Sequence, residues 1–121
     1  MFNNSFKRDE IPEEVLSSVQ NTYLFFVMLK KAKGLNEEGK EKLSAFKSAT
    51  ESNVWSFTLI AEIAEFYLAN LRLARQHPKK VIPGRLKECH TVIGFLEKHF
   101  EIKSSPLGTM LVVKTNKGGV L

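Results

Sequence analysis

Three histidines and a single cysteine are the side chains in this sequence best suited to acid–base, nucleophilic or metal chemistry. Cys89 stands alone, which excludes a disulfide within the sequence and a multi-cysteine zinc site. The histidines, His77, His90 and His99, lack the i,i+4 spacing of a helical metal pair. Asp9 is the sole Asp, so a multi-carboxylate nuclease centre would have to rest on Glu. We therefore expect no metal and no cofactor.

An arginine precedes a histidine by five positions twice, from Arg72 to His77 and from Arg85 to His90. This Arg-x4-His spacing resembles the motif of HEPN-type ribonucleases, which are all-helical domains of similar size. The resemblance implies that the His is a general base on a ribose 2′-OH and that the Arg stabilises the phosphorane. Binding is nevertheless favoured over catalysis. Cys89 falls on an apolar helical line typical of a structural thiol, and Walker, G-x-G-x-x-G and G-x-S-x-G motifs are absent.

Positive charge is concentrated towards the C-terminal end of the sequence. Residues 1–71 carry eight Lys/Arg against ten Asp/Glu, a net charge of −2. Residues 72–121 carry ten Lys/Arg against three Glu, a net charge of +7. Because clustered cations attract polyanions, this asymmetry indicates a nucleic-acid partner.

The spacing of apolar residues predicts four helices, over 12–33, 37–49, 53–76 and 83–99. Gly34, Asn36 and Pro78 supply stop and start signals, and Ser52 or Asn53 is the expected cap of the third helix. In the last helix the apolar line is spaced 3-4-3-4, through Leu86, Cys89, Ile93, Leu96 and Phe100. The run Ser105-Pro106-Leu107-Gly108 is typical of a type I turn, so 100–104 and 109–114 are predicted to pair as a β-hairpin.

The predicted fold is a single mainly α domain, with a four-helix core over 12–100 and a short C-terminal β-hairpin over 100–114. Residues 1–10 are expected to be a flexible leader, and residues 115–121 a mobile tail. Nine Phe against two Tyr and one Trp indicates that most aromatic rings fill the core. The longest apolar run, from Tyr23 to Leu29, is far too short for a bilayer, and the N-terminus lacks a signal-peptide pattern. A cytoplasmic location without a membrane partner is expected.

A predicted helix followed directly by a hairpin occupies residues 85–114, RLKECHTVIGFLEKHFEIKSSPLGTMLVVK. This segment, a quarter of the chain, resembles the recognition helix and wing of winged-helix replication and transcription proteins. The resemblance implies that the helix over 85–99 enters a major groove and that the 104–108 turn lies near a phosphate backbone.

The side chains opposite the apolar line of this helix suit nucleic-acid binding. Lys87, Thr91, Gly94 and Lys98 share that face, and Arg85 stands at the helix start, where it could reach base edges. Several lysines on one face would give affinity that falls steeply with salt. The candidate contacts are Lys79, Lys80, Arg85, Lys87, Thr91, Lys98, Lys103, Lys114 and Lys117. The first hypothesis is a small basic accessory or regulatory protein that binds DNA in preference to RNA; a merely solvated lysine face is the alternative interpretation.

Protein–protein interaction is the second hypothesis, and ribonuclease activity the third. A leader, a polar seam on the third helix and a hairpin edge would suit a phage or plasmid accessory protein, an antitoxin or an immunity factor. The run YLFFVML in the first helix is apolar all round and needs cover on every side. A homodimer would supply the cover that a four-helix monomer offers only in part.

Overall fold

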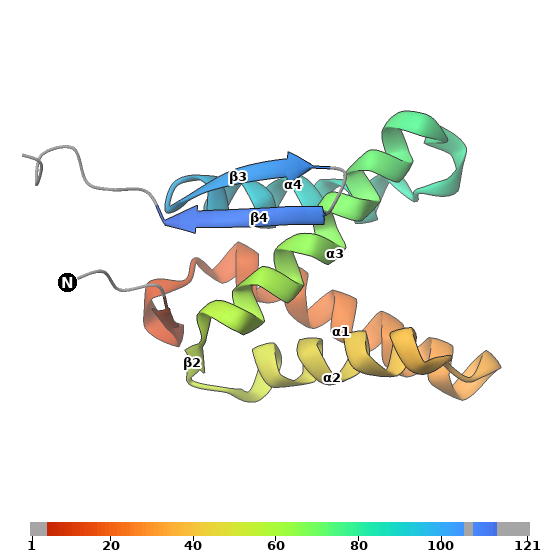
Figure 1. Ribbon diagram of the computed structural model, residues 1–121. Coiled ribbons are helices and arrows are strands. Elements are labelled where there is room, and N and C mark those ends of the chain that lie inside the picture. The colour runs from red at the N-terminus through yellow and green to blue at the C-terminus, as the bar shows by residue number, and fades with distance from the viewer. Residues whose placement is uncertain (1–4, 106–107, 114–121) are drawn as a thin grey trace, which may run out of the picture.

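The computed structural model describes residues 5–105 and 108–113. Within these residues the chain forms four α-helices, two short 3-10 helices and two two-stranded antiparallel sheets (Figure 1). The mainly α fold with a small C-terminal β-hairpin is thereby confirmed. In chain order the elements are β1 (Phe6–Lys7), η1 (Arg8–Glu10), α1 (Glu13–Lys33), α2 (Glu37–Glu51), β2 (Val54–Trp55), α3 (Phe57–Gln76), η2 (Pro78–Lys80), α4 (Pro83–Glu97), β3 (Phe100–Ser105) and β4 (Gly108–Val113).

The turn between α1 and α2 uses the two residues that the sequence singles out. Gly34 adopts a φ of 76°, a left-handed conformation that glycine reaches without steric cost, and α1 ends there. The side chain of Asn36 then accepts a hydrogen bond from the backbone N–H of Gly39 at 2.8 Å and caps α2. This short turn holds α1 and α2 together as a helical pair (Figure 1).

The third helix begins later than the sequence predicts, because Val54 and Trp55 form strand β2 instead of a first helical turn. The indole N–H of the fully buried Trp55 donates to the carbonyl of Ala49 at 2.8 Å, which holds the chain extended at this point. Ser56 is therefore the N-cap, and its hydroxyl accepts from the N–H of Leu59 at 3.2 Å. The expected cap at Ser52 or Asn53 was wrong.

Residues 5–10 also differ from the flexible leader that the sequence suggests. Phe6 pairs with Trp55 in the β1–β2 sheet and is only 7% exposed. The guanidinium of Arg8 donates to the carbonyl of Thr50 at 2.7 Å. The ring of Phe6 lies 5.1 Å from that of Phe95, measured between centroids. Burial of one large ring fixes this segment against α4; residues 1–4 lie outside the described part of the chain.

Aromatic rings fill the centre of the helical core, as the composition predicts. Phe46 lies 5.1 Å from Phe66 and 5.7 Å from Tyr67, with near-perpendicular rings, and Phe26 stacks on Phe46 at 6.0 Å. Edge-to-face packing of this kind adds to the burial energy of each ring. Of the phenylalanines that the structure describes, Phe25 alone is exposed.

Helix α4 and the hairpin lie within the basic C-terminal part of the sequence. The helix ends at Glu97, slightly before the predicted 99, because the N–H of Lys98 bonds back to the carbonyls of Phe95 and Leu96. Phe100 is then buried as the first residue of β3. The register pairs Ile102 with Leu111, and the hairpin lies alongside α4 (Figure 1). The predicted turn residues 106–107 and the tail 114–121 lie outside the described residues.

None of the helices that the structure describes has the length and apolar character needed to cross a bilayer.

Candidate nucleic-acid interface

The outward face of α4 carries three of the predicted contact residues in one strip. Lys87, Thr91 and Lys98 follow one another along the helix, and Lys87 and Lys98 are exposed. At 1.5 Å rise per residue, the two lysine Cα atoms lie about 16 Å apart along the helix axis. A Cβ placed on Gly94, between them, would meet nothing within 4 Å apart from the backbone of its own helix turn. The backbone of this strip is therefore open to an incoming partner.

A shallow concave surface borders this strip on the side of α1. Its lining joins the strip to Pro12, Glu14 and Val15 at the start of α1. The lining thus holds two lysines against one glutamate, so its formal charge is positive. Thr91 donates its hydroxyl to the carbonyl of Lys87 at 3.0 Å, which leaves the oxygen lone pairs as acceptors.

Arg85, the predicted base-reading residue, is instead bound within the protein. Its Nη1 donates to Glu88 Oε1 at 2.6 Å and to Thr22 Oγ1 at 3.2 Å. Its guanidinium carbon lies 4.6 Å from the centroid of the Phe25 ring. The two charged side chains, Arg85 and Glu88, are 19% and 17% exposed, so the pair is largely shielded from solvent. Arg85 therefore joins α4 to α1, a tertiary contact that its position at the start of the helix does not predict.

Behind this ion pair lies a small buried polar network. The hydroxyls of Thr22 and Tyr67 are 2.6 Å apart, and Thr22 also donates to the carbonyl of Ser18 at 3.0 Å. Burial raises the pKa of the Tyr67 phenol well above its ordinary value, although its hydrogen bond to Thr22 opposes the rise. Burial likewise raises the pKa of the Cys89 thiol to about 11, with Glu88 adding to the rise and Arg85 opposing it. Both groups are neutral at physiological pH, and Cys89 is fully buried, as is usual for a cysteine that packs in a core.

The remaining candidates lie around the strip. Lys79 and Lys80 form the exposed 3-10 helix η2 just before α4. Lys103 is exposed on β3, with its Nζ 3.6 Å from Glu101 Oε1, an ion pair that solvent weakens. Lys114 and Lys117 lie outside the described residues.

The two residues of the Arg-x4-His pair on α4 face different helices. Arg85 contacts α1, whereas the exposed His90 lies beside Arg72 and Arg75 of α3. A concave surface joins these three side chains with Glu97 over an apolar floor. Sequence reasoning missed this grouping, because His90 meets the two arginines through the packing of α3 on α4. It extends the basic surface of α4 towards α3.

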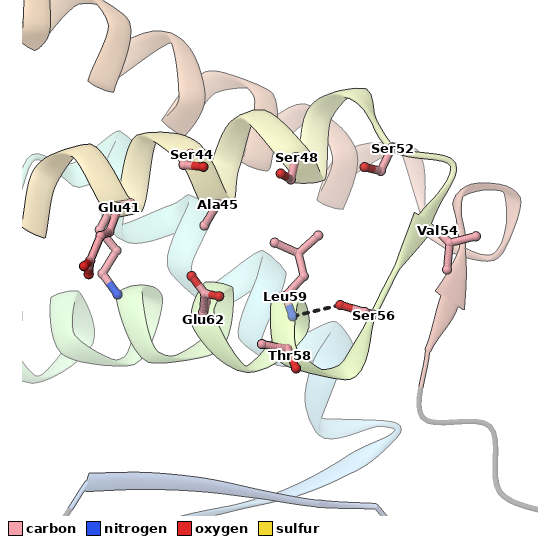
Figure 2. Close-up of a pocket in the computed structure, with 11 residues that line it drawn as sticks. Glu41, Ser44, Ala45, Ser48, Ser52, Val54, Ser56, Thr58, Leu59 and Glu62 are labelled. Carbon is pink, nitrogen blue, oxygen red and sulfur yellow. Dashed lines mark hydrogen bonds between the residues drawn. The ribbon is translucent and has the colours of Figure 1, made fainter.

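A third concave surface lies between α2 and α3, and it is rich in hydroxyl groups. Figure 2 shows Ala45, Leu59 and Glu62 pointing into the space between the two helices. Its lining also includes the hydroxyl residues Ser44, Ser48, Ser52, Ser56 and Thr58. The carboxylates of Glu41 and Glu62 outnumber the one lysine, Lys42, so this groove does not suit a polyanion.

Within the described ranges, His, Cys, Asp and Glu side chains do not gather in groups of three that could hold a metal ion. Comparison of the chain with protein-family models, curated proteins and solved structures finds no match. The α4 surface, with its exposed lysines, is therefore the candidate site from which a function can be inferred.

Proposed function

We propose that this chain is a small nucleic-acid-binding protein, of the accessory or regulatory kind, that contacts duplex DNA through the outward face of α4. The observation that carries the proposal is the open strip of Lys87, Thr91 and Lys98, with clear space above Gly94. Cations on one helix face bind phosphates, and an uncovered helix face can enter a groove.

The flanks of the strip support the same partner. Lys79 and Lys80 precede α4, and Arg75 of α3 lies beside α4, so cationic groups flank the helix on more than one side. An α-helix fits the wide major groove of B-form DNA, whereas the major groove of duplex RNA is too narrow for it. DNA is therefore preferred to RNA.

Fluorescence anisotropy with duplex DNA, single-stranded DNA and RNA at two salt concentrations tests the proposal. We expect duplex DNA to bind most tightly. For four phosphate contacts, affinity should fall roughly 100-fold between 50 mM and 200 mM salt. Lys87→Ala and Lys98→Ala should each weaken binding and reduce the salt slope by about one.

Lysines on α2 supply the matched controls. Lys40 and Lys47 are exposed on the helix that lies across the molecule from α4 (Figure 1). Alanine at either position removes the same charge and should leave the affinity unchanged. Absence of binding at low salt, or equal losses for the α2 and α4 variants, would overturn the proposal.

A protein-interaction role is the second candidate, favoured by one observation. Leu24 and Met28 of α1 are exposed large apolar side chains on neighbouring turns of one helix face. Clustered exposure of this kind marks interaction sites more often than isolated exposed apolar residues do.

A further inference from the structure

Helix α1 leaves one complete face in water. Leu24 is 48% exposed and Met28 is 68% exposed, and they lie four residues apart. Ser17, Gln20, Asn21 and Lys31 are exposed on the same side at helical spacing. We call this set, from Glu13 to Lys31, the outer strip of α1. Its apolar members, Leu24 and Met28, are the residues of YLFFVML that the four helices leave most exposed.

The outer strip is opposite the packed face of the same helix. Val15, Val19, Thr22 and Phe26 are buried, and they project about half a turn away from Leu24. Phe25 lies at the margin, with the guanidinium of Arg85 over its ring. Asn21 lies at the same margin, where its side-chain amide donates to Glu88 Oε2 of α4 at 3.1 Å. The rest of the outer strip makes no contact of this kind with the residues that the structure describes and is open along the helix.

Charge is distributed unevenly along the outer strip. Glu13 stands exposed at its N-terminal end and Lys31 at its C-terminal end, with the apolar side chains between them. In a dimer with a two-fold axis, both copies use the same surface: if one residue of the first copy contacts a second residue of the other copy, the reverse contact is made as well. In an antiparallel arrangement the acidic end of each strip faces the basic end of the other. A parallel arrangement would place like charges together.

We propose that the chain forms a homodimer through antiparallel packing of the outer strip of α1, with the two-fold axis near Leu24. Each Leu24 then packs on its own copy, and Met28 covers the aliphatic part of Gln20 in the second copy. Lys31 lies within about one helical turn of Glu13 of the second copy, which the long lysine side chain can span. The occupant of the apolar strip is a second copy of this chain, because the strip is complementary in charge to itself.

Sedimentation velocity of the full chain, without nucleic acid and across the micromolar range, measures the association. We expect a monomer–dimer equilibrium whose dissociation constant rises at least about tenfold in Leu24→Lys and in Met28→Lys. Val54→Lys is the matched control, since Val54 is 49% exposed on β2, away from α1. It should leave the equilibrium unchanged. Circular dichroism of each variant checks that the helices are intact.

Charge reversal tests the antiparallel arrangement. Glu13→Lys alone and Lys31→Glu alone should each weaken the dimer, and the double variant should restore it, since both ion pairs are rebuilt with reversed polarity. A chain that stays monomeric throughout the concentration range overturns the proposal, even if α1 captures some other protein. A double variant weaker than both single variants also overturns it. Neither result depends on nucleic-acid binding.

Discussion

Arg85 of α4 lies over the ring of Phe25 in α1, with its guanidinium carbon 4.6 Å from the ring centroid. The same guanidinium holds Glu88 at 2.6 Å and Thr22 at 3.2 Å. One side chain therefore makes a cation–π contact, an ion pair and a hydrogen bond to a buried hydroxyl. It joins the near-neutral helical pair α1–α2 to the basic end of the chain.

Replacement of Arg85 by Ala should reduce stability and leave nucleic-acid affinity almost unchanged. The substitution leaves the largely shielded Glu88 carboxylate without its cation and removes the contact on Phe25. We expect a loss of about 1–3 kcal/mol in the free energy of unfolding, measured by urea denaturation. If Arg85→Ala instead weakens DNA binding as much as Lys87→Ala, with stability intact, then Arg85 contacts DNA after all.

Removal of the Thr22 hydroxyl should lower the stability of the fold, although the group is a single oxygen atom. Thr22→Val keeps the shape of the side chain but removes the nearer of the two hydrogen-bond partners of Tyr67, leaving the Ser18 carbonyl at 3.3 Å, and one of the partners of Arg85. When a buried phenol loses its shortest hydrogen bond, the free energy of unfolding falls by about 1–3 kcal/mol. Urea denaturation measures the loss, and Tyr67→Phe in the Thr22→Val background should recover part of it. Equal stability of Thr22→Val and the unaltered chain would show that the network contributes nothing.

Stability should fall at alkaline pH because of Cys89. The thiol, with an ordinary pKa of 9.0, has a folded-state pKa of about 11, so the unfolded chain releases its proton first. The stabilising contribution is complete below pH 9 and is lost as pH rises towards 11, by about 2–3 kcal/mol in all. Tyr67 acts in the same direction at still higher pH. Urea unfolding at a series of pH values should show this loss, and Cys89→Ala should reduce the slope between pH 9 and 11; an unchanged slope would refute the assignment.

The N-terminal segment should contribute to stability like a core element. Phe6→Ala removes a ring that is 7% exposed and packs on Phe95, His99 and Phe100. Large-to-small changes of this kind cost about 3–5 kcal/mol. Thermal denaturation provides the measurement, with Lys7→Ala, an exposed neighbour, as control. A near-zero effect of Phe6→Ala would support the flexible leader that the sequence suggests.

The helices and hairpin were predictable because their signals are local. Gly34, Asn36 and Pro83 mark helix ends by their own conformational properties, and the 3-4 spacing marks the buried sides. The β1–β2 sheet was not predictable, since it pairs residues far apart in sequence with only two residues on each strand.

In the candidate site, too, the features set by one helix were predictable from the sequence, and the contacts between helices were not. The strip of Lys87, Thr91 and Lys98 follows from helical geometry, and the structure places these residues together on one face. The direction of Arg85 does not follow from it, because Phe25 and Thr22 of α1 attract that side chain away from the strip. His90 meets Arg75 only through the packing of α3 on α4.

The partners of Phe6 also determine when the fold can be completed during synthesis. A chain leaves the ribosome in the direction from N- to C-terminus, so Phe6 emerges well before its partners Phe95 and Phe100. Helices α1 and α2 can form and pair meanwhile, because their contacts are close in sequence. Until α4 is released from the ribosome, the Phe6 ring lacks the Phe95 ring on which it packs in the folded protein. The core around Phe6 therefore closes late, when α4 and the start of β3 arrive and cover that ring.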